Sequence, residues 1–278
     1  MYKIIFLLIL ECSQWLCLYG DNNLQYKEKT FTPITSAEKY MEYRKTQADY
    51  PKFPPPKTVI TIYSTSLLKR ILTDYKHNRG TGSFKELYLL EDGKIGVFYI
   101  GGMGAPALIH KMEELIAFGV KKFISIGYAG ALTHEFSVGD FVMHSKALSE
   151  DGVGHLYLGK WSSFASVNPD FSIAWTNFMK EKYPQHVAFK NGVSWSFPCL
   201  FRETQEDVQR VVKLGCNTVE MEIAAFFAIS QEKNVQGLAL YVISDSLADG
   251  KWNPHKQDSS IKENIKEIAD LAIEFSKI

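Results

Sequence analysis

The chain has 278 residues, of which 46% are hydrophobic and 22% charged, so it is long enough to bury a sizeable core. Lysine plus arginine and aspartate plus glutamate both number 31, and no basic block stands out. This balance gives no support to nucleic-acid binding, which depends on neutralising phosphates with positive charge.

The first twenty residues differ from the rest of the chain. Lys3 precedes an apolar run over residues 4–10, and Gly20 stands before the polar residues 21–23. This order is typical of a secretory signal peptide cleaved near Gly20, and it predicts a secreted protein. Glu11 interrupts the apolar stretch, so we do not expect a membrane-spanning helix. A cytoplasmic protein with a buried or disordered N-terminal extension is the alternative.

Residues 21–57 form the predicted N-terminal arm, with a weak helical pattern over residues 37–43. The proline cluster in residues 51–56 cannot continue a helix, so this part is expected to be extended. Residues 58–278 are expected to form a single domain. Cys199 and Cys216 fit neither a disulfide framework nor a zinc motif, and we expect both to be buried thiols.

Strands and helices alternate from residue 58 onward. We predict strands over residues 58–63, 94–100, 122–126, 140–145 and 237–243, and helices over residues 67–75, 106–118, 219–231 and 260–276. The alternation favours an α/β fold of three layers, αβα, with a central mixed, largely parallel twisted sheet. In such folds ligands bind at the carboxyl ends of the strands.

Two glycine-rich segments fall at such strand ends. The first is GGMG at residues 101–104, between a predicted strand and a predicted helix, and the second is GYAG at residues 127–130. Glycine lets the backbone approach a ligand closely, and a helix N-terminus offers free N–H groups. A tight turn explains either segment alone, whereas two of them at one edge of a sheet favour a shared pocket.

Carboxylates mark two further segments. Glu220 and Glu222 lie two residues apart in an otherwise apolar stretch, where a charged group is costly unless it is paired or binds a ligand. We favour ligand binding; the alternative is that both stay solvated and interact with the helix dipole. Asp245 follows a strongly apolar strand, a position suited to acid–base chemistry, and a helix N-cap is an equal alternative there.

Together these segments resemble the nucleoside phosphorylase superfamily, from about Pro55 to the C-terminus. The matching motifs keep the order of the family: IGGMG, IGYAGAL, SEDG with Tyr157, VEME and SDSL, at residues 100–104, 126–132, 149–152, 219–222 and 244–247. The resemblance implies a phosphorylase/hydrolase-like fold. It also implies cleavage of the N-glycosidic bond of a nucleoside, without a metal or an organic cofactor.

The resemblance assigns roles to individual residues. It implies that Asp245 is catalytic and protonates or hydrogen-bonds the departing base, and that Glu222 accepts hydrogen bonds from the ribose hydroxyls. A departing base anion is unstable, so a positioned acid lowers the barrier. The remaining assignments are Met221 and Gly102 to the ribose, and Ser244, Gly130 and an aromatic, Phe201 or Phe197, to the base.

The first strand departs from the family pattern. Phosphorolytic members carry a Gly-Asp-Pro-x-Arg loop there, and this chain has YSTSL at residues 63–67. Tyr63 aligns with the phosphate-binding glycine, Leu67 with the arginine, Ser125 with a second family arginine and Tyr128 with a family serine. Arg79 aligns with an arginine that reaches the site of a neighbouring subunit.

The expected phosphate site therefore has few charged ligands, although a buried phosphate normally needs several charge-assisted contacts. It consists of Ser64, Ser66, Ser125 and a neighbouring copy's Arg79. We favour phosphorolysis of a purine nucleoside slightly, with inorganic phosphate as co-substrate, in a homo-oligomer (a dimer or a trimer of dimers). One alternative is a nucleoside hydrolase, although residues 63–67 lack the carboxylate that nucleosidases use. Another is a secreted nucleoside-binding or storage protein without turnover.

Overall fold

The computed structural model describes residues 33–186, 188–255 and 258–278, which form one compact unit from Pro33 to Ile278. The predicted signal peptide lies outside these residues. Within them, no helix combines the length and the apolar character that crossing a membrane requires.

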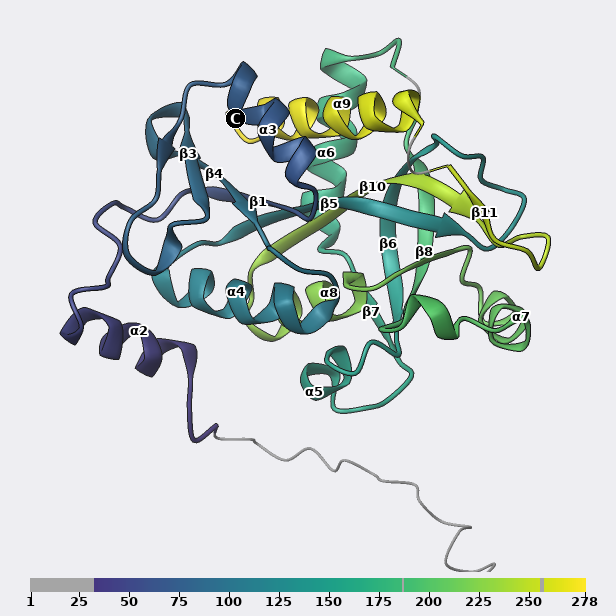
Figure 1. The fold of residues 1–278 in the computed structure, drawn as a ribbon, viewed down its shortest axis with the longest axis horizontal. Helices are drawn as coiled ribbons and strands as arrows, with labels where there is room; N and C mark the ends of the chain where they lie inside the picture. Colours follow the sequence, from purple (N-terminus) through teal and green to yellow (C-terminus); the bar gives the residue numbers. More distant parts are fainter. Residues whose placement is uncertain (1–32, 187, 256–257) are drawn as a thin grey trace, which may run out of the picture. The chain divides into compact units, whose positions relative to one another are not determined.

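The strands and helices alternate along the chain as expected (Figure 1). The strands are β1 (Thr58–Ile62), β2 (Asn78–Arg79), β3 (Leu87–Leu90), β4 (Ile95–Tyr99), β5 (Lys122–Ala131), β6 (Phe141–Ser149), β7 (Phe164–Ser166), β8 (Lys190–Ser196), β9 (Thr218–Glu220), β10 (Gln236–Ser246) and β11 (Asn253–Pro254). The α-helices are α2 (Ala37–Thr46), α3 (Thr65–Asp74), α4 (Ala105–Phe118), α5 (Gly154–Leu158), α6 (Pro169–Lys182), α7 (Gln205–Lys213), α8 (Ile223–Glu232) and α9 (Ser259–Phe275).

The strands form one mixed sheet in the order β11-β10-β6-β8-β9-β5-β1-β4-β3-β2, with β7 beside β6. The central pairs β4–β1, β1–β5 and β5–β10 are parallel. Because β10 pairs with both β6 and β5, the strands β5, β10, β6, β8 and β9 close into a ring. The register of this ring makes the last residues of these strands neighbours, because Gly130 of β5 pairs with Asp245 of β10 and with Val219 of β9, and Glu220 of β9 pairs with Ser196 of β8.

Helices cover both faces of the sheet, which confirms the predicted three-layer fold. Helices α4 and α8 pack on one face around Tyr241 and Ala129, and α3, α6 and α9 pack on the other around Ile124 and Val242 (Figure 1). Ala129 and Ile124 point to opposite faces because successive side chains of a strand alternate. Helix α2, in the predicted N-terminal arm, joins the first of these layers, with Met41 buried.

Four sequence predictions need correction. Residues 127–130 are not a loop, because they continue β5 and pair with β10. Residues 219–222 are not helical, since β9 ends at Glu220 and α8 starts at Ile223. Asp245 is no helix N-cap, because β10 extends to Ser246 and pairs with β11. Cys199 is exposed in the loop before α7, whereas Cys216 is buried as expected.

Candidate active site

Gly130 is the point where the predicted motifs meet. It pairs with Asp245 of β10 on one side and with Val219 of β9 on the other. A Cβ atom added to Gly130 would lie 3.1 Å from Leu247 Cδ1 and 3.4 Å from Asp245 Oδ2. The absence of a side chain at Gly130 therefore leaves room for Leu247 and Val219, and the Asp245 carboxylate lies next to the backbone of β5.

Glu220, the first carboxylate of the VEME motif, is buried and bound within the protein. Its Oε2 accepts hydrogen bonds from the backbone N–H groups of Glu222 and Ile223, both at 2.6 Å. Its Oε1 accepts from the hydroxyls of Ser194, at 3.0 Å, and Ser196. Burial, followed by the neighbouring carboxylate of Glu222, raises the pKa of Glu220. Glu220 therefore holds the N-terminus of α8 in place, and the sequence-based expectation that it binds a ligand is wrong.

Glu222, the second carboxylate, is the N-cap residue of α8 and is also buried. Its Oε1 accepts a hydrogen bond from the backbone N–H of Gly104, at 2.5 Å. Gly104 has a φ of 91°, which favours glycine, and it is the N-cap of α4. The backbone carbonyl of Met221 accepts from the N–H of Ala105 at 3.0 Å. The GGMG segment and the VEME motif thus meet where α4 and α8 begin.

Asp245 lies on the opposite side of Gly130 from β9. Its Oδ1 accepts a hydrogen bond from the Ser244 hydroxyl at 2.6 Å, and its Oδ2 accepts from the indole N–H of Trp252 at 3.0 Å. The Ser244 hydroxyl therefore positions the carboxylate of Asp245. Trp252 was not predicted from the sequence; it comes from the loop between β10 and β11.

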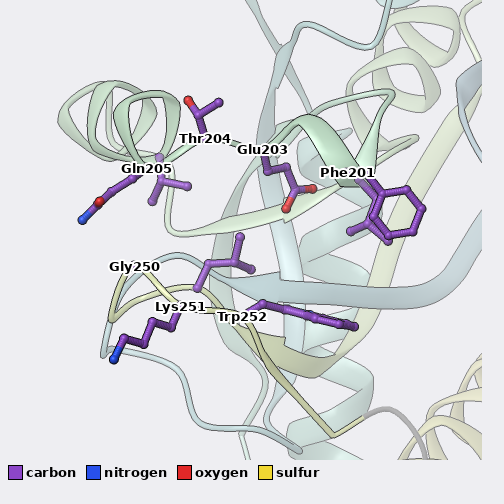
Figure 2. Close-up of a pocket in the computed structure, with 10 residues that line it drawn as sticks. Phe201, Glu203, Thr204, Gln205, Gly250, Lys251 and Trp252 are labelled. Carbon is purple, nitrogen blue, oxygen red and sulfur yellow. The ribbon is translucent and has the colours of Figure 1, made fainter.

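A cavity of about 250 Å³ is lined by Trp252, the hydrogen-bond partner of Asp245 (Figure 2). Its walls come from two segments, the start of α7 with the loop before it and the loop after β10. Phe201, which is 89% exposed, lies on this cavity, whereas Phe197 stacks on Trp195 with ring centroids 4.4 Å apart. Of the two aromatics that the sequence offered for stacking on a base, Phe201 is the one that lines the cavity.

Glu203 is the second carboxyl group of this cavity. Figure 2 shows its carboxyl group pointing into the same space as Phe201 and Trp252. Desolvation raises the pKa of Glu203 to about 7, and the negative charge of Asp245 adds to this rise. Glu203 was not predicted from the sequence, because it stands in the polar segment RETQED, where carboxylates are ordinary surface residues.

The SEDG segment holds one wall of this cavity in place. Glu150 accepts two hydrogen bonds from the guanidinium of Arg210, at 2.9 and 2.8 Å, and one from the indole of Trp195 at 2.8 Å. Burial alone would raise the pKa of Glu150, but the hydrogen bonds from Arg210, Ser162 and Trp195 lower it below its ordinary value. The bidentate pair ties α7 to the end of β6, and the bond from Trp195 adds β8, so Glu150 fixes the wall that carries Glu203.

A row of three hydroxyls lies at the carboxyl end of β1. The phenol of Tyr63 is 3.0 Å from Ser125 Oγ, which is 3.1 Å from the phenol of Tyr241. Ser125 is fully buried, and a Cβ atom on Gly127 would lie only 2.6 Å from the ring of Tyr241. Burial raises the pKa of Tyr63, and the charges of Glu222 and Glu220 add to this rise. The negative charges of Glu222 and Glu220 therefore act on the Tyr63 phenol.

The other predicted phosphate ligands do not join these hydroxyls. Ser64 is the N-cap of α3, and its Oγ lies 2.8 Å from Ser66 Oγ. Arg79 lies exposed on β2, where its Nε donates a hydrogen bond to the carbonyl of Lys85 at 2.8 Å. Of the four predicted ligands, only Ser125 contacts Tyr63. Among the described residues, no cluster of His, Cys, Asp and Glu has the arrangement to hold a metal ion.

The site offers one chemical function on each side of Gly130. On the Asp245 side, two carboxyl groups and two aromatic rings can receive a flat heterocycle and exchange a proton with it. On the Glu222 side, a buried carboxylate where α4 and α8 begin can accept hydrogen bonds from sugar hydroxyls.

The chain is similar in sequence to known proteins. The sequence model of the phosphorylase superfamily matches residues 65–277. The purine nucleoside phosphorylase DeoD-type 1 of Shewanella oneidensis is 26% identical over 174 residues, which are 62% of this chain and 71% of that protein. The guanosine phosphorylase of Halorubrum lacusprofundi is 26% identical over 175 residues, which are 63% of this chain and 71% of that protein.

Two solved structures share the fold. The purine nucleoside phosphorylase from Toxoplasma gondii, in complex with immucillin-H, matches with a TM-score of 0.67 and 14% identity, over 80% of this chain and 90% of that one. A futalosine hydrolase mutant of Helicobacter pylori matches with a TM-score of 0.61 and 19% identity, over 80% of this chain and 99% of that one.

Proposed function

Because the chain belongs to the phosphorylase superfamily, we propose that it cleaves the N-glycosidic bond of a purine nucleoside. The observation that carries this proposal is the position of Asp245 against Gly130, hydrogen-bonded to Trp252 of a cavity that Phe201 and Glu203 also line. Relatives named as purine nucleoside and guanosine phosphorylases support a purine as the base.

On the base side, we infer that the purine ring lies between the aromatic side chains of the cavity. Asp245, held by Ser244 and Trp252, interacts with the departing base as its charge develops, and Glu203 reaches the base from α7's side of the cavity. A positioned acid stabilises the leaving group in the transition state, where the ring nitrogen gains electron density.

On the ribose side, Glu222 is the proposed ligand of the sugar hydroxyls. Its anchoring by the Gly104 N–H fixes one carboxylate oxygen and orients the group. A buried, oriented carboxylate also stabilises positive charge on the sugar as the glycosidic bond breaks. Met221 and Gly102, on the two segments that meet here, complete the proposed ribose site.

For the nucleophile, the sequence slightly favours phosphate, and one structural observation favours water. Tyr63 and Ser125 stand where the resemblance expects phosphate ligands, and the charged groups acting on Tyr63 are carboxylates. The same fold occurs in a futalosine hydrolase, so the fold is compatible with hydrolysis. Hydrolysis is therefore the second candidate function.

The test is an assay of the purified full chain with inosine, adenosine and uridine, with and without inorganic phosphate. Release of hypoxanthine or adenine supports the proposal, and its dependence on phosphate separates phosphorolysis from hydrolysis. Tight binding of a nucleoside without release of base would overturn the proposal in favour of a binding or storage protein. Faster cleavage of uridine than of inosine would contradict the purine preference.

A further inference from the structure

Tyr63 is the side chain that decides which nucleophile this site can use. It follows β1 directly and packs against the core on the face of the sheet that also carries α4 and α8. Those helices begin at Gly104 and Glu222, the residues on the proposed ribose side. The phenol therefore lies on the same face of the sheet as Gly104 and Glu222, the face from which a nucleophile would approach the proposed ribose.

The hydroxyl row fixes the phenol in this place. Ser125 bonds to both Tyr63 and Tyr241, so its single proton can go to only one of them. If Tyr241 donates to Ser125 and Ser125 donates to Tyr63, the proton of Tyr63 remains available to a further acceptor. Burial raises the pKa of both phenols, so Tyr63 keeps that proton at neutral pH.

The charges around Tyr63 oppose an anion. Glu222 and Glu220 are the charged groups that act on its pKa, and each would repel a phosphate dianion. A phosphate in a buried site needs several charge-assisted donors. Here the neighbouring groups are neutral hydroxyls, whose bonds to one another already use part of their hydrogen-bonding capacity. A neutral nucleophile is not repelled by Glu222 and Glu220, and it does not need several charge-assisted donors.

We propose that Tyr63 fills the anion subsite of this pocket and that its hydroxyl holds the water molecule that attacks the ribose. This inference rests on the proposed nucleoside cleavage. The water oxygen forms the new bond to C1′, and the C1′–N bond breaks with its electron pair on the base. The base takes a proton from the carboxyl groups on its side, and the proton of the water passes to Glu222. The products are the free base and free ribose.

The first experiment measures the products and the binding of phosphate to the wild-type full chain. We expect free ribose at a rate that does not change when inorganic phosphate is added. We also expect phosphate to leave the melting temperature unchanged, because a ligand that binds the folded state would raise it. Ribose 1-phosphate among the products, or stabilisation by phosphate, overturns the inference.

The second experiment reopens the subsite. The double variant Tyr63→Gly with Ser125→Arg removes the ring and adds a cation, so phosphate should raise its melting temperature and give ribose 1-phosphate. The matched control Tyr63→Phe keeps the ring and loses only the hydroxyl. It should remain insensitive to phosphate and cleave about three- to tenfold more slowly, the effect of about one lost hydrogen bond. A phosphate response in Tyr63→Phe contradicts the steric role of the ring.

Failure of the proposed function would give a different experimental result from failure of the inference about Tyr63. If no variant releases base from any nucleoside, the cleavage proposal fails. The phosphate-binding measurement still tests the blocked subsite, because it needs no turnover. Stabilisation of the wild-type chain by phosphate then refutes the role of Tyr63, and stabilisation of the reopened variant alone supports it.

Discussion

At the scale of single residues, the base side places two carboxyl groups in different surroundings. Both oxygens of Asp245 already accept hydrogen bonds, from Ser244 and from Trp252. Glu203 stands in a largely apolar cavity, where desolvation raises its pKa to about 7. The two groups therefore differ in how firmly they are held, and the raised pKa lets Glu203 exchange its proton near neutral pH.

We expect Asp245→Asn to lower kcat/KM for inosine by about 100-fold or more, the usual contribution of a positioned acid or base. The matched control is Asp249→Asn, four residues further along, because Asp249 is exposed and pairs only loosely with His134 at 3.4 Å. This control should cleave like the wild-type chain. An Asp245→Asn enzyme of undiminished rate would show that Asp245 takes no part in catalysis.

Glu203 should give the enzyme a pH dependence near neutrality. Below about pH 7 its neutral carboxyl group can donate a hydrogen bond to the base, and above it the second negative charge beside Asp245 weakens purine binding. Nucleoside affinity, measured by calorimetry, should therefore fall as the pH rises through about 7. Glu203→Gln stays neutral and should flatten this profile. An unchanged profile in this variant would assign the titration to another group.

The same residue links pH to folding. The pKa of Glu203 is raised from 4.5 to about 7, so the folded chain binds more protons than the unfolded chain between these values. The stabilisation from protonated Glu203 is full below about pH 4.5 and is lost as the pH rises through about 7. In urea denaturation, the free energy of unfolding should therefore fall less steeply over this window in Glu203→Gln than in the wild-type chain.

At the scale of the elements, the segment VEMEIAA illustrates what a sequence can predict. The glutamates in an apolar stretch indicated buried carboxylates, and both are buried. The segment was expected to be one helix, but its first residues form β9, which has only three residues and pairs with β5 and β8. Such a short strand is fixed by long-range pairing, and local periodicity carries no signal for it.

The four hydrogen bonds that Glu220 accepts give a stability prediction. Glu220→Ala leaves the N–H groups of Glu222 and Ile223 without their acceptor, and we expect a loss of about 3 kcal/mol in the free energy of unfolding. Glu220→Gln keeps one acceptor oxygen of the same shape and should cost about 1 kcal/mol. Urea denaturation of both variants checks this order. Equal stability of the two variants would contradict the role of Glu220 at the start of α8.

At the scale of the whole molecule, the layered fold was predictable because strands and helices alternate with clear apolar patterns. The ring closed by β6, β8 and β9 was not, since it depends on pairings across the stretch from residue 150 to residue 218, for which the sequence predicted no elements. The base site was the least predictable part, because Glu203 and Trp252 lie in polar loops. Trp252 reaches Asp245 across the β10–β11 hairpin, and Glu203 comes from a segment for which the sequence predicted no element. Asp245 and Glu222 were found because their motifs are contiguous.

The position of Arg79 in the sheet bears on the oligomeric state of the protein. Its strand, β2, is separated from β10 in the sheet by β3, β4, β1 and β5, so within one chain Arg79 does not accompany Asp245. An arginine at this exposed edge serves a site only in another copy, as the resemblance implies. With Tyr63 in the anion subsite, such an arginine has no phosphate to bind. We therefore expect Arg79→Ala to matter only where Tyr63→Gly and Ser125→Arg have reopened the subsite.

In that reopened background, Arg79→Ala should reduce the response of base release to phosphate by about tenfold, the effect of losing one charge-assisted contact of roughly 1.5 kcal/mol. Sedimentation analysis at the assay concentration should find a dimer or a larger homo-oligomer. The matched control is Arg70→Ala, because Arg70 is bound to Glu263 and the carbonyl of Lys262 in its own chain, and this variant should leave the phosphate response intact. A monomer that still responds to Arg79→Ala would mean that the arginine acts within its own chain, against the order of the strands.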